Sequence, residues 1–392
     1  MRASWLRLTA AALLLAGASP TTTPPSVPPT DAPALALLGK DRVGIRTLTV
    51  PGAAGRTLRV VLWYPASAAA GARPAPYKHL LRPPPPLKPL QVTTAALASP
   101  NAPPVPGAKP LVVLSHGYGG WPESMSYLAE NLASKGYVVA GIDHQDLPFT
   151  DAAGFRRSFG LTVATRARDQ QAVIAALADP RFASSVDPNR VALIGYSMGG
   201  FGALATAGAG YDPLSPIVRD LPAGALEDQL AGKRRAEPRL KALVAIAPWG
   251  AQAPHRAWST DGLKALRVPM LVITGDQDDV SGYRDGIGPL FEAATGTERH
   301  LLTYRNARHN VGGNPSPTEA REVFALRELF DEPVWRSDRL NAINQHFVTA
   351  FLDLHLKDLR ERETFLRAPW PGFQPRWNLG FEMKSSPATT GG

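Results

Sequence analysis

The stretch VALIGYSMGG, residues 191–200, decides the fold. It is apolar and β-branched at first and then presents a serine, Ser197, with glycines two positions away on either side, Gly195 and Gly199. A strand that turns abruptly into a helix exposes the turn residue at the tip of a sheet, and its neighbours must be small because strand and helix pass close together there. The stretch therefore predicts a strand, a tight turn at Ser197 and a helix that begins at Met198.

Strands and helices alternate in both directions from this stretch. Continuous apolar segments separated by helical patterns predict a mostly parallel sheet with helices on both faces. About eight strands fit into one sheet, the first two as an antiparallel pair at its edge, so we expect one domain over residues 43–360. The expected strands are VGIRTLTV, RTLRVVLWYP, PLVVLS, YVVAGI, VALIGY, LKALVAIAP, VPMLVITG and HLLTY.

Three segments interrupt this pattern. Residues 65–110 are rich in proline and poor in periodicity, and residues 211–238 and 311–335 each separate two regular elements. The last two segments are expected near the carboxyl edge of the sheet, where ligands bind in such folds. We therefore predict lid-like insertions at all three places, and we assign residues 361–392 to a C-terminal tail.

The amino terminus has the pattern of a secretory signal. Arg2 and Arg7 precede an apolar run, Leu8 to Ala18, which is too short to span a bilayer and ends in small residues. We predict a signal peptide over residues 1–18 and a Pro-rich spacer over residues 19–42. The protein is then expected to be secreted or periplasmic, with no integral membrane span after cleavage.

Composition narrows the classes of function. The 42 Lys and Arg residues outnumber the 33 Asp and Glu residues, but they are scattered rather than clustered, which argues against nucleic-acid binding. The chain has no cysteine, so disulfides, thiolate nucleophiles and thiolate metal sites are excluded. Zinc and calcium motifs are absent from the sequence, and we expect neither a metal nor a cofactor. The oligomeric state is left open.

A serine hydroxyl is a weak nucleophile until a base takes its proton. In the predicted architecture the chain order is serine, acid, histidine. His309 follows the last expected strand, whereas His116 and His144 precede the serine, so we predict His309 as the base. The acid lies in GDQDD, and we choose Asp278, with Asp276 as the alternative, because its spacing lets the loop turn before the carboxylate faces the histidine.

An attacked carbonyl becomes an oxyanion, which needs preorganised hydrogen-bond donors. The backbone N–H of Met198, at the start of its helix, is one candidate donor. The second is the N–H of Tyr118 in SHGYGG, which follows the strand PLVVLS, and Gly117 lets the chain turn sharply there. We predict these two N–H groups as the oxyanion hole.

Two other residues at the same edge are candidate substrate contacts. Trp249 ends the strand LKALVAIAP and can offer a flat apolar wall. His144 follows the strand YVVAGI and can add a polar contact. Core packing is the alternative role that we weigh for Trp249.

The motifs SHGYGG, GYSMGG, GDQDD and RHN, in this order, resemble the α/β-hydrolase superfamily. The chain is similar to bacterial dienelactone-hydrolase-like and platelet-activating-factor-acetylhydrolase-like serine esterases, and YSMGG is also similar to cutinase-like polyester hydrolases. The dienelactone hydrolases proper use a cysteine nucleophile, which this chain lacks. The resemblance implies an α/β-hydrolase fold, a nucleophile elbow and a catalytic triad of Ser197, His309 and Asp278.

We therefore expect a serine hydrolase that cleaves small or polymeric carboxylic esters through an acyl-enzyme. The alternatives that use the same triad are amide, peptide or polyester hydrolysis and acyl transfer to a non-water acceptor. A catalytically silent recognition module is the alternative from another class. The natural substrate and its acyl length are not predicted.

Overall fold

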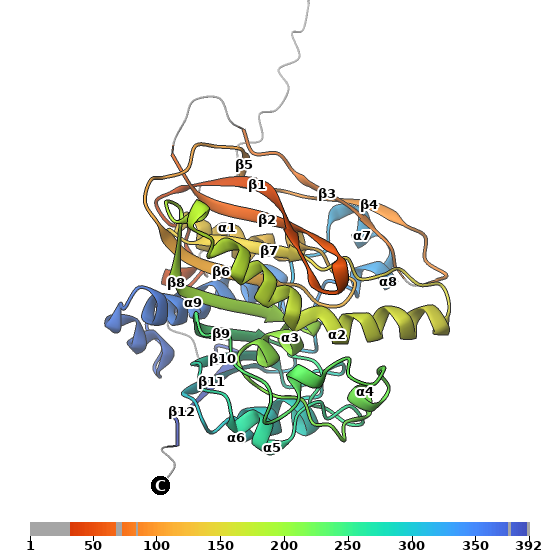
Figure 1. Ribbon diagram of the computed structural model, residues 1–392. Coiled ribbons are helices and arrows are strands. Elements are labelled where there is room, and N and C mark those ends of the chain that lie inside the picture. The colour runs from red at the N-terminus through yellow and green to blue at the C-terminus, as the bar shows by residue number, and fades with distance from the viewer. Residues whose placement is uncertain (1–31, 68–72, 84, 375–377, 390–392) are drawn as a thin grey trace, which may run out of the picture. The chain divides into compact units, whose positions relative to one another are not determined.

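A sheet of ten strands runs through the part of the chain that the computed structural model describes, residues 32–67, 73–83, 85–374 and 378–389 (Figure 1). The strands are β1 (Arg42–Pro51), β2 (Thr57–Ala66), β5 (Ser99–Pro100), β6 (Lys109–Ser115), β7 (Val138–Asp143), β8 (Val186–Tyr196), β9 (Leu240–Ile246), β10 (Met270–Gly275), β11 (Arg299–Tyr304) and β12 (Phe381–Ser386). Their order across the sheet is β12-β11-β10-β9-β8-β6-β7-β2-β1-β5.

The centre of this sheet, from β7 to β11, is parallel. Antiparallel strands lie on both sides of it, since β2 pairs with β7, β1 with β2, and β12 with β11. Successive side chains of a strand point to opposite faces. Leu111 and Val113 of β6 thus join one apolar cluster, and Val112 and Leu114 join another. The predicted parallel sheet with an antiparallel edge is confirmed.

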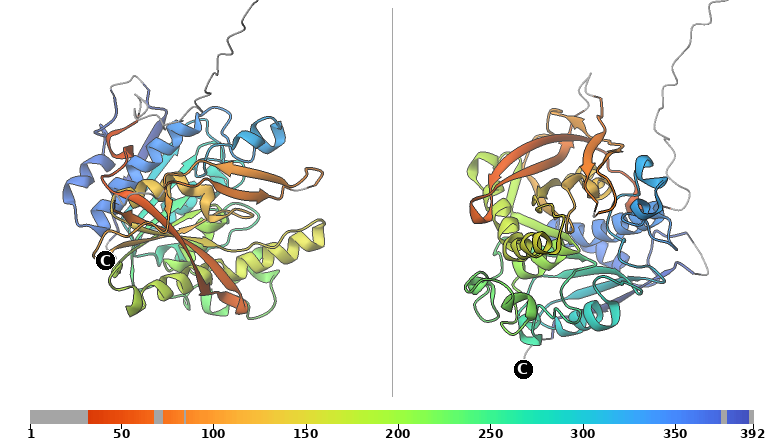
Figure 2. Two further views of the ribbon diagram at one scale, coloured as in Figure 1. Left: turned by 90° about the horizontal axis from the view of Figure 1, so that it is seen from above. Right: turned by 90° about the vertical axis from the view of Figure 1, so that its right-hand side faces the viewer.

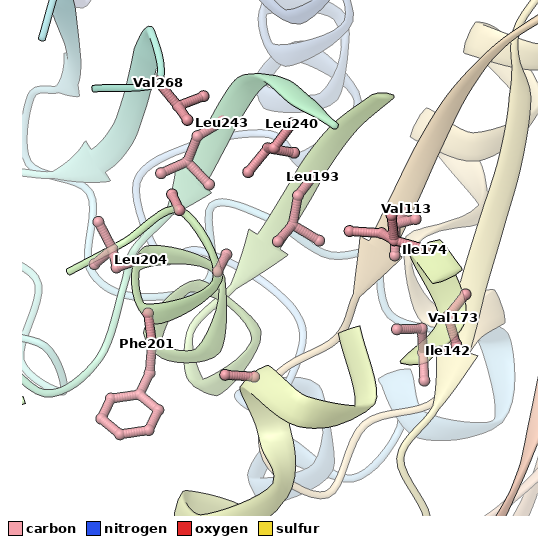
Figure 3. Close-up of a cluster of buried hydrophobic side chains, with 14 of the residues drawn as sticks. Val113, Ile142, Val173, Ile174, Leu193, Phe201, Leu204, Leu240, Leu243 and Val268 are labelled. Atoms are coloured by element: carbon pink, nitrogen blue, oxygen red, sulfur yellow. The ribbon is translucent and has the colours of Figure 1, made fainter. Parts of the chain in front are cut away.

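Helices cover both faces of the sheet, as the apolar runs predict. The helices on one face are α2 (Ala152–Leu177), α3 (Met198–Thr206), α5 (Thr260–Lys264) and α6 (Gly288–Ala293). Those on the other face are α1 (Ser126–Ser134) and α9 (Ser337–Leu356). Figure 3 shows part of the first cluster, with Val113 and Leu193 from strands and Val173 and Ile174 from α2. Burying each such side chain contributes about 1.5–3 kcal/mol.

Two of the predicted insertions contain regular structure and pack against each other. Residues 65–110 include a hairpin of β3 (Tyr77–Leu81) and β4 (Leu90–Thr94), and residues 311–335 include α7 (Thr318–Arg321) and α8 (Phe324–Arg327). The hairpin lies beside these short helices (Figures 1 and 2). A small apolar cluster joins them, made of Leu81, Val92, Trp121, Ala320 and Leu326. The third insertion, residues 211–238, contains α4 (Pro216–Arg219).

Two predicted boundaries need correction. The tail that the sequence analysis assigns to residues 361–392 includes β12, which pairs with β11 over its full length and buries Phe381. The spacer assigned to residues 19–42 also joins the fold near its end, because the Leu35 N–H donates to His346 Nδ1 at 3.2 Å. Both segments form hydrogen bonds with distant parts of the domain. The local sequence pattern did not indicate these long-range contacts.

The predicted signal peptide, residues 1–18, lies outside the described residues. Across the described ranges, no helix has both the length and the apolar composition that a membrane crossing requires.

Candidate active site

Ser197 occupies the turn between β8 and α3, with a φ of 53° and a ψ of −115°. A non-glycine residue held in such a conformation costs on the order of 1–3 kcal/mol and persists only where its surroundings impose it. Here the Ser197 N–H donates to Ile246 O at 2.9 Å and Ser197 O accepts from the Phe201 N–H at 3.0 Å. These backbone bonds hold the serine at the carboxyl end of the central strands.

The glycines around Ser197 leave no room for side chains. A Cβ on Gly195 would lie 2.3 Å from Gly199 O, and a Cβ on Gly199 would lie 2.0 Å from Ser115 O. Real Cβ atoms do not approach other atoms so closely. The small residues of the motif are therefore required by the close passage of β8, α3 and the end of β6.

Three polar side chains from separate loops meet at this turn. His309 Nε2 lies 3.0 Å from Ser197 Oγ, and His309 Nδ1 lies 3.0 Å from each carboxylate oxygen of Asp278. Asp278 is buried, and its Oδ1 also accepts the N–H groups of Val280 at 3.0 Å and Ser281 at 2.7 Å. The carboxylate is thus fixed by its own loop while it faces the imidazole.

The two other aspartates of GDQDD point elsewhere. Asp276 Oδ1 accepts the Asn306 N–H at 2.7 Å, which ties the loop after β10 to the loop after β11. Asp279 forms an exposed ion pair with Arg308. The structure therefore places Asp278, and not Asp276, against His309.

The loop after β6 lies directly beside the serine. A Cβ on Gly117 would be 3.3 Å from Ser197 Cβ, so the absence of a side chain lets the loop approach. Tyr118 follows in this loop, and Met198 begins α3 on the other side of the serine. The first N–H groups of a helix have no acceptor within the helix, and the positive end of the helix dipole is there.

Polar side chains behind this loop hold it in place, a role that the sequence analysis did not assign to them. The Gly119 N–H donates to Asp146 Oδ2 at 2.9 Å, and Arg166 Nη2 lies 2.9 and 2.8 Å from the two oxygens of the same carboxylate. The Tyr118 hydroxyl donates to Ser158 Oγ at 2.7 Å. A signal was available in GIDHQD, where Asp146 follows β7 at the carboxyl edge of the sheet.

His144 does not join the substrate side of the site, which corrects the sequence prediction. Its ring is buried beneath the loop, with Nε2 2.8 Å from Ser115 Oγ and Nδ1 3.1 Å from Asp169 Oδ2. Burial lowers the pKa of His144 well below its usual value, and the charge of Arg166 acts in the same direction. This second Ser–His–Asp alignment is enclosed, so it supports the loop and is not available to a substrate.

Trp249 lies next to the serine, in an aromatic cluster. Its backbone N–H donates to Ser197 O at 3.2 Å, and its ring centroid lies 5.0 Å from that of Phe159. The cluster continues from Phe159 to Tyr118 at 5.5 Å and to the exposed Phe155 at 5.4 Å. Trp249 itself is 8% exposed, so it combines core packing with a position at the edge of the site.

Tyr196, the residue before the serine, also contacts the histidine. Its ring stacks on the His309 ring with centroids 5.5 Å apart, and its hydroxyl donates to His309 O at 3.3 Å. Burial raises the pKa of Tyr196, so the hydroxyl remains a neutral donor. The sequence analysis did not identify this contact, although the position next to Ser197 was a signal for it.

Comparisons with known proteins find similarity to ester hydrolases. A family model described as PET hydrolase-like matches residues 104–213, which include β6, β7, β8 and the serine turn. The chain is similar to cutinase est1 of Thermobifida alba, with 26% identity over 50% of this chain and 52% of that protein.

Two other relatives give similar values. Cutinase 2 of Thermobifida cellulosilytica is 28% identical over 56% of this chain and 67% of that protein. Bis(hydroxyethyl) terephthalate hydrolase of Streptomyces coelicolor is 24% identical over 56% of this chain and 57% of that protein. The chain thus spans about half to two thirds of the length of the curated relatives that it matches. With this sheet and these relatives, the chain belongs to the α/β-hydrolase superfamily.

Proposed function

We propose that the protein is a serine hydrolase that cleaves carboxylic esters through an acyl-enzyme intermediate. The observation on which the proposal mainly rests is the continuous line of contacts from Ser197 Oγ through the His309 ring to Asp278, each of 3.0 Å. The cutinase and ester hydrolase relatives support the same reaction class.

In the first step His309 Nε2 takes the proton of Ser197 Oγ while the oxygen attacks the carbonyl carbon of the ester. Asp278 accepts the His309 Nδ1–H, which selects the tautomer with a free Nε2 and stabilises the imidazolium that forms. The strained turn at Ser197 holds the hydroxyl against His309 before substrate arrives, so the side chains need little reorganisation for the reaction.

The carbonyl oxygen becomes an oxyanion, and the N–H groups of Tyr118 and Met198 receive it in our proposal. Loss of one such donor costs about 10²–10³ in kcat in hydrolases of this kind. The imidazolium then gives its proton to the leaving alcohol, and the Ser197 ester remains. In the second half His309 takes a proton from a water molecule as the water attacks the acyl carbon, and the imidazolium then returns that proton to Ser197 Oγ as the acid leaves.

The test of this function is the variant Ser197→Ala. We expect kcat for p-nitrophenyl butyrate to fall by at least about 10³-fold, because the nucleophile is gone while the fold is retained. A fluorophosphonate probe should label the wild-type protein on Ser197 and should not label the variant.

The matched control is Ser67→Ala, which removes an exposed serine in the loop after β2. This control should keep full turnover and full labelling. If Ser197→Ala hydrolyses the ester at the wild-type rate, the proposed function is wrong.

A finer candidate is the hydrolysis of aromatic or polymeric esters. It is favoured by a series of aromatic rings that begins at Trp249, whose backbone N–H donates to Ser197 O, and continues through Phe159 to Tyr118 and to exposed Phe155 on α2. The amino-terminal turns of this helix extend past the strands of the ten-stranded sheet (Figure 1). The relative from Streptomyces coelicolor is named for an aromatic diester, bis(hydroxyethyl) terephthalate.

This finer candidate predicts release of terephthalate monoester from bis(hydroxyethyl) terephthalate, measured by liquid chromatography, with Ser197→Ala as the blank. We expect turnover at least comparable to that of p-nitrophenyl butyrate, because the rings give an apolar, aromatic surface against which an aromatic acyl group can pack. Turnover of the butyrate ester without any of the diester would restrict the function to small aliphatic acyl groups.

We also propose that the protein acts outside the cytoplasm, as a secreted or periplasmic enzyme. The support is the signal-peptide pattern of residues 1–18.

A further inference from the structure

Glu332 is a buried carboxylate in the insertion 311–335, with 6% of its surface exposed. It follows α8 and precedes α9, so it is far along the chain from the strands that form the site. A buried carboxylate is stable only when its oxygens are hydrogen-bonded. Its partners therefore indicate what the residue does.

Both oxygens of Glu332 are bonded to the backbone on either side of the site histidine. Oε2 accepts the Arg308 N–H at 2.6 Å, and Oε1 accepts the Asn310 N–H at 2.6 Å. The carboxylate thus spans His309 with one oxygen on each flank. Hydrogen bonds to an ionised acceptor are about twice as strong as those between neutral groups. The orientation of the peptide units that carry the His309 side chain is fixed by these two bonds.

The neighbouring Asp331 fixes Glu332 in turn. Asp331 Oδ1 accepts the Ser316 N–H at 2.9 Å, and Oδ2 accepts the Ser316 hydroxyl at 2.6 Å. The Ser337 hydroxyl donates to Oδ1 at 3.1 Å. These bonds join the beginning of the insertion to the start of α9. The position of Glu332 is therefore set by the folded insertion and not by the histidine loop alone.

We propose that Glu332 is a positioning residue for His309, and that the insertion 311–335 acts in catalysis through it. The carboxylate holds the backbone of residues 308–310 so that Nε2 stays within 3.0 Å of Ser197 Oγ while Nδ1 stays on Asp278. Glu332 takes no proton and touches no substrate in this role. The inference rests on the proposed function, since it assumes that His309 is the base.

The test is Glu332→Gln, which keeps the size of the side chain and replaces one acceptor oxygen with an NH₂ donor. One of the two backbone N–H groups then faces a donor, and the loop shifts. Because small displacements of a catalytic group can cost about 10²-fold, we expect kcat for p-nitrophenyl butyrate to fall by about 10–100-fold with KM within about twofold. The rate of fluorophosphonate labelling of Ser197 should fall by a similar factor.

The matched control is Glu328→Gln, which removes the same charge from an exposed side chain of the same segment. This variant should keep the wild-type kcat. An equal loss of kcat in both variants would mean that removing a negative charge from this segment is enough to lower kcat. That result would overturn the proposal. An unchanged kcat in Glu332→Gln, or a change in KM alone, would also overturn it.

A second variant keeps the test decisive if Glu332→Gln does not fold. Glu332→Asp retains the charge but is one methylene shorter, so it can reach one flank of His309 and not both. Its kcat should fall with KM unchanged, and a wild-type kcat would overturn the proposal. Wild-type turnover by Ser197→Ala would instead reject the proposed function itself, so the two failures are distinct.

Discussion

The loop that contains Tyr118 and the loop that contains His309 are each held by a buried carboxylate, but in different electrostatic surroundings. Asp146 holds the first loop through the Gly119 N–H and is paired with the buried guanidinium of Arg166. Glu332 holds the second loop through two backbone N–H groups. The charge of Asp146 is balanced by the buried guanidinium of Arg166, and that of Glu332 is balanced by the dipoles of two peptide N–H groups.

The pKa values of the two carboxylates move in opposite directions for this reason. Burial alone acts to raise the pKa of Asp146, but the charge of Arg166 outweighs it and the pKa lies below its ordinary value. Burial raises the pKa of Glu332, and the hydrogen bonds from Arg308 and Asn310 offset only part of that rise. Both carboxylates thus hold a backbone loop, but the Asp146 anion is stabilised by its surroundings and the Glu332 anion is less stable.

The two clamps also come from different parts of the fold. Asp146 follows β7 and Arg166 lies within α2, so the loop that contains Tyr118 is held from the sheet and a helix packed on it. Glu332 belongs to the insertion 311–335, which the sequence analysis expected to act as a lid. We infer that changes in this insertion reach His309 through Glu332, whereas the loop that contains Tyr118 meets the insertion at its far end, where Trp121 packs against Phe330.

The largest effect should come from removing the buried cation. Arg166→Met leaves Asp146 buried without its partner, and loss of one member of a buried ion pair costs about 3–5 kcal/mol. We expect the free energy of unfolding, measured by guanidinium denaturation, to fall by about that amount. The same substitution on the other side, Arg308→Met, breaks an exposed pair with Asp279 and should cost about 0–1 kcal/mol. If both variants lose the same free energy of unfolding, the two arginines contribute equally, and the proposed electrostatic difference between the two loops is wrong.

Parts of the site that depend on local pattern were predictable from the sequence. The turn at Ser197 follows from glycines that the crossing of strand and helix requires, and the apolar runs predict the parallel strands. The spacing after β10 favoured Asp278 and left Asp276 as the alternative, and the structure places Asp278 against His309. In each case the physical constraint acts within a few residues.

The residues that the sequence analysis missed depend on long-range contacts. Glu332 lies in ALRELFDEPVW, where three acidic side chains are close in sequence, and the fold alone decides which one is buried. Arg166 lies inside a helix, where a charged residue is usually exposed. Strand β12 buries one residue, Phe381, and its other side chains are mostly polar, so its pairing with β11 is not visible in its composition.

The smallest effect, and the sharpest test of the comparison, is the pH dependence of stability. For Glu332 the folded pKa is above the ordinary 4.5, so the folded protein holds this proton more tightly than the unfolded chain. The contribution of Glu332 to stability is then fully present below pH 4.5 and is lost as the pH rises through the folded pKa. The free-energy difference between wild type and Glu332→Gln should therefore shrink as the pH rises from about 4.5 towards 8.

For Asp146 the sign is reversed. Its folded pKa is below the ordinary 3.8, so its contribution is fully present above that pH and is lost as the pH falls through the folded pKa. The difference between wild type and Asp146→Asn should stay constant from about pH 8 to 4 and shrink only under more acid conditions. Guanidinium unfolding of the wild type, Glu332→Gln and Asp146→Asn, from about pH 8 to below about pH 4, measures both free-energy differences. If the two differences change in the same direction, then the surroundings of the two carboxylates are alike, and the asymmetry between the two loops does not exist.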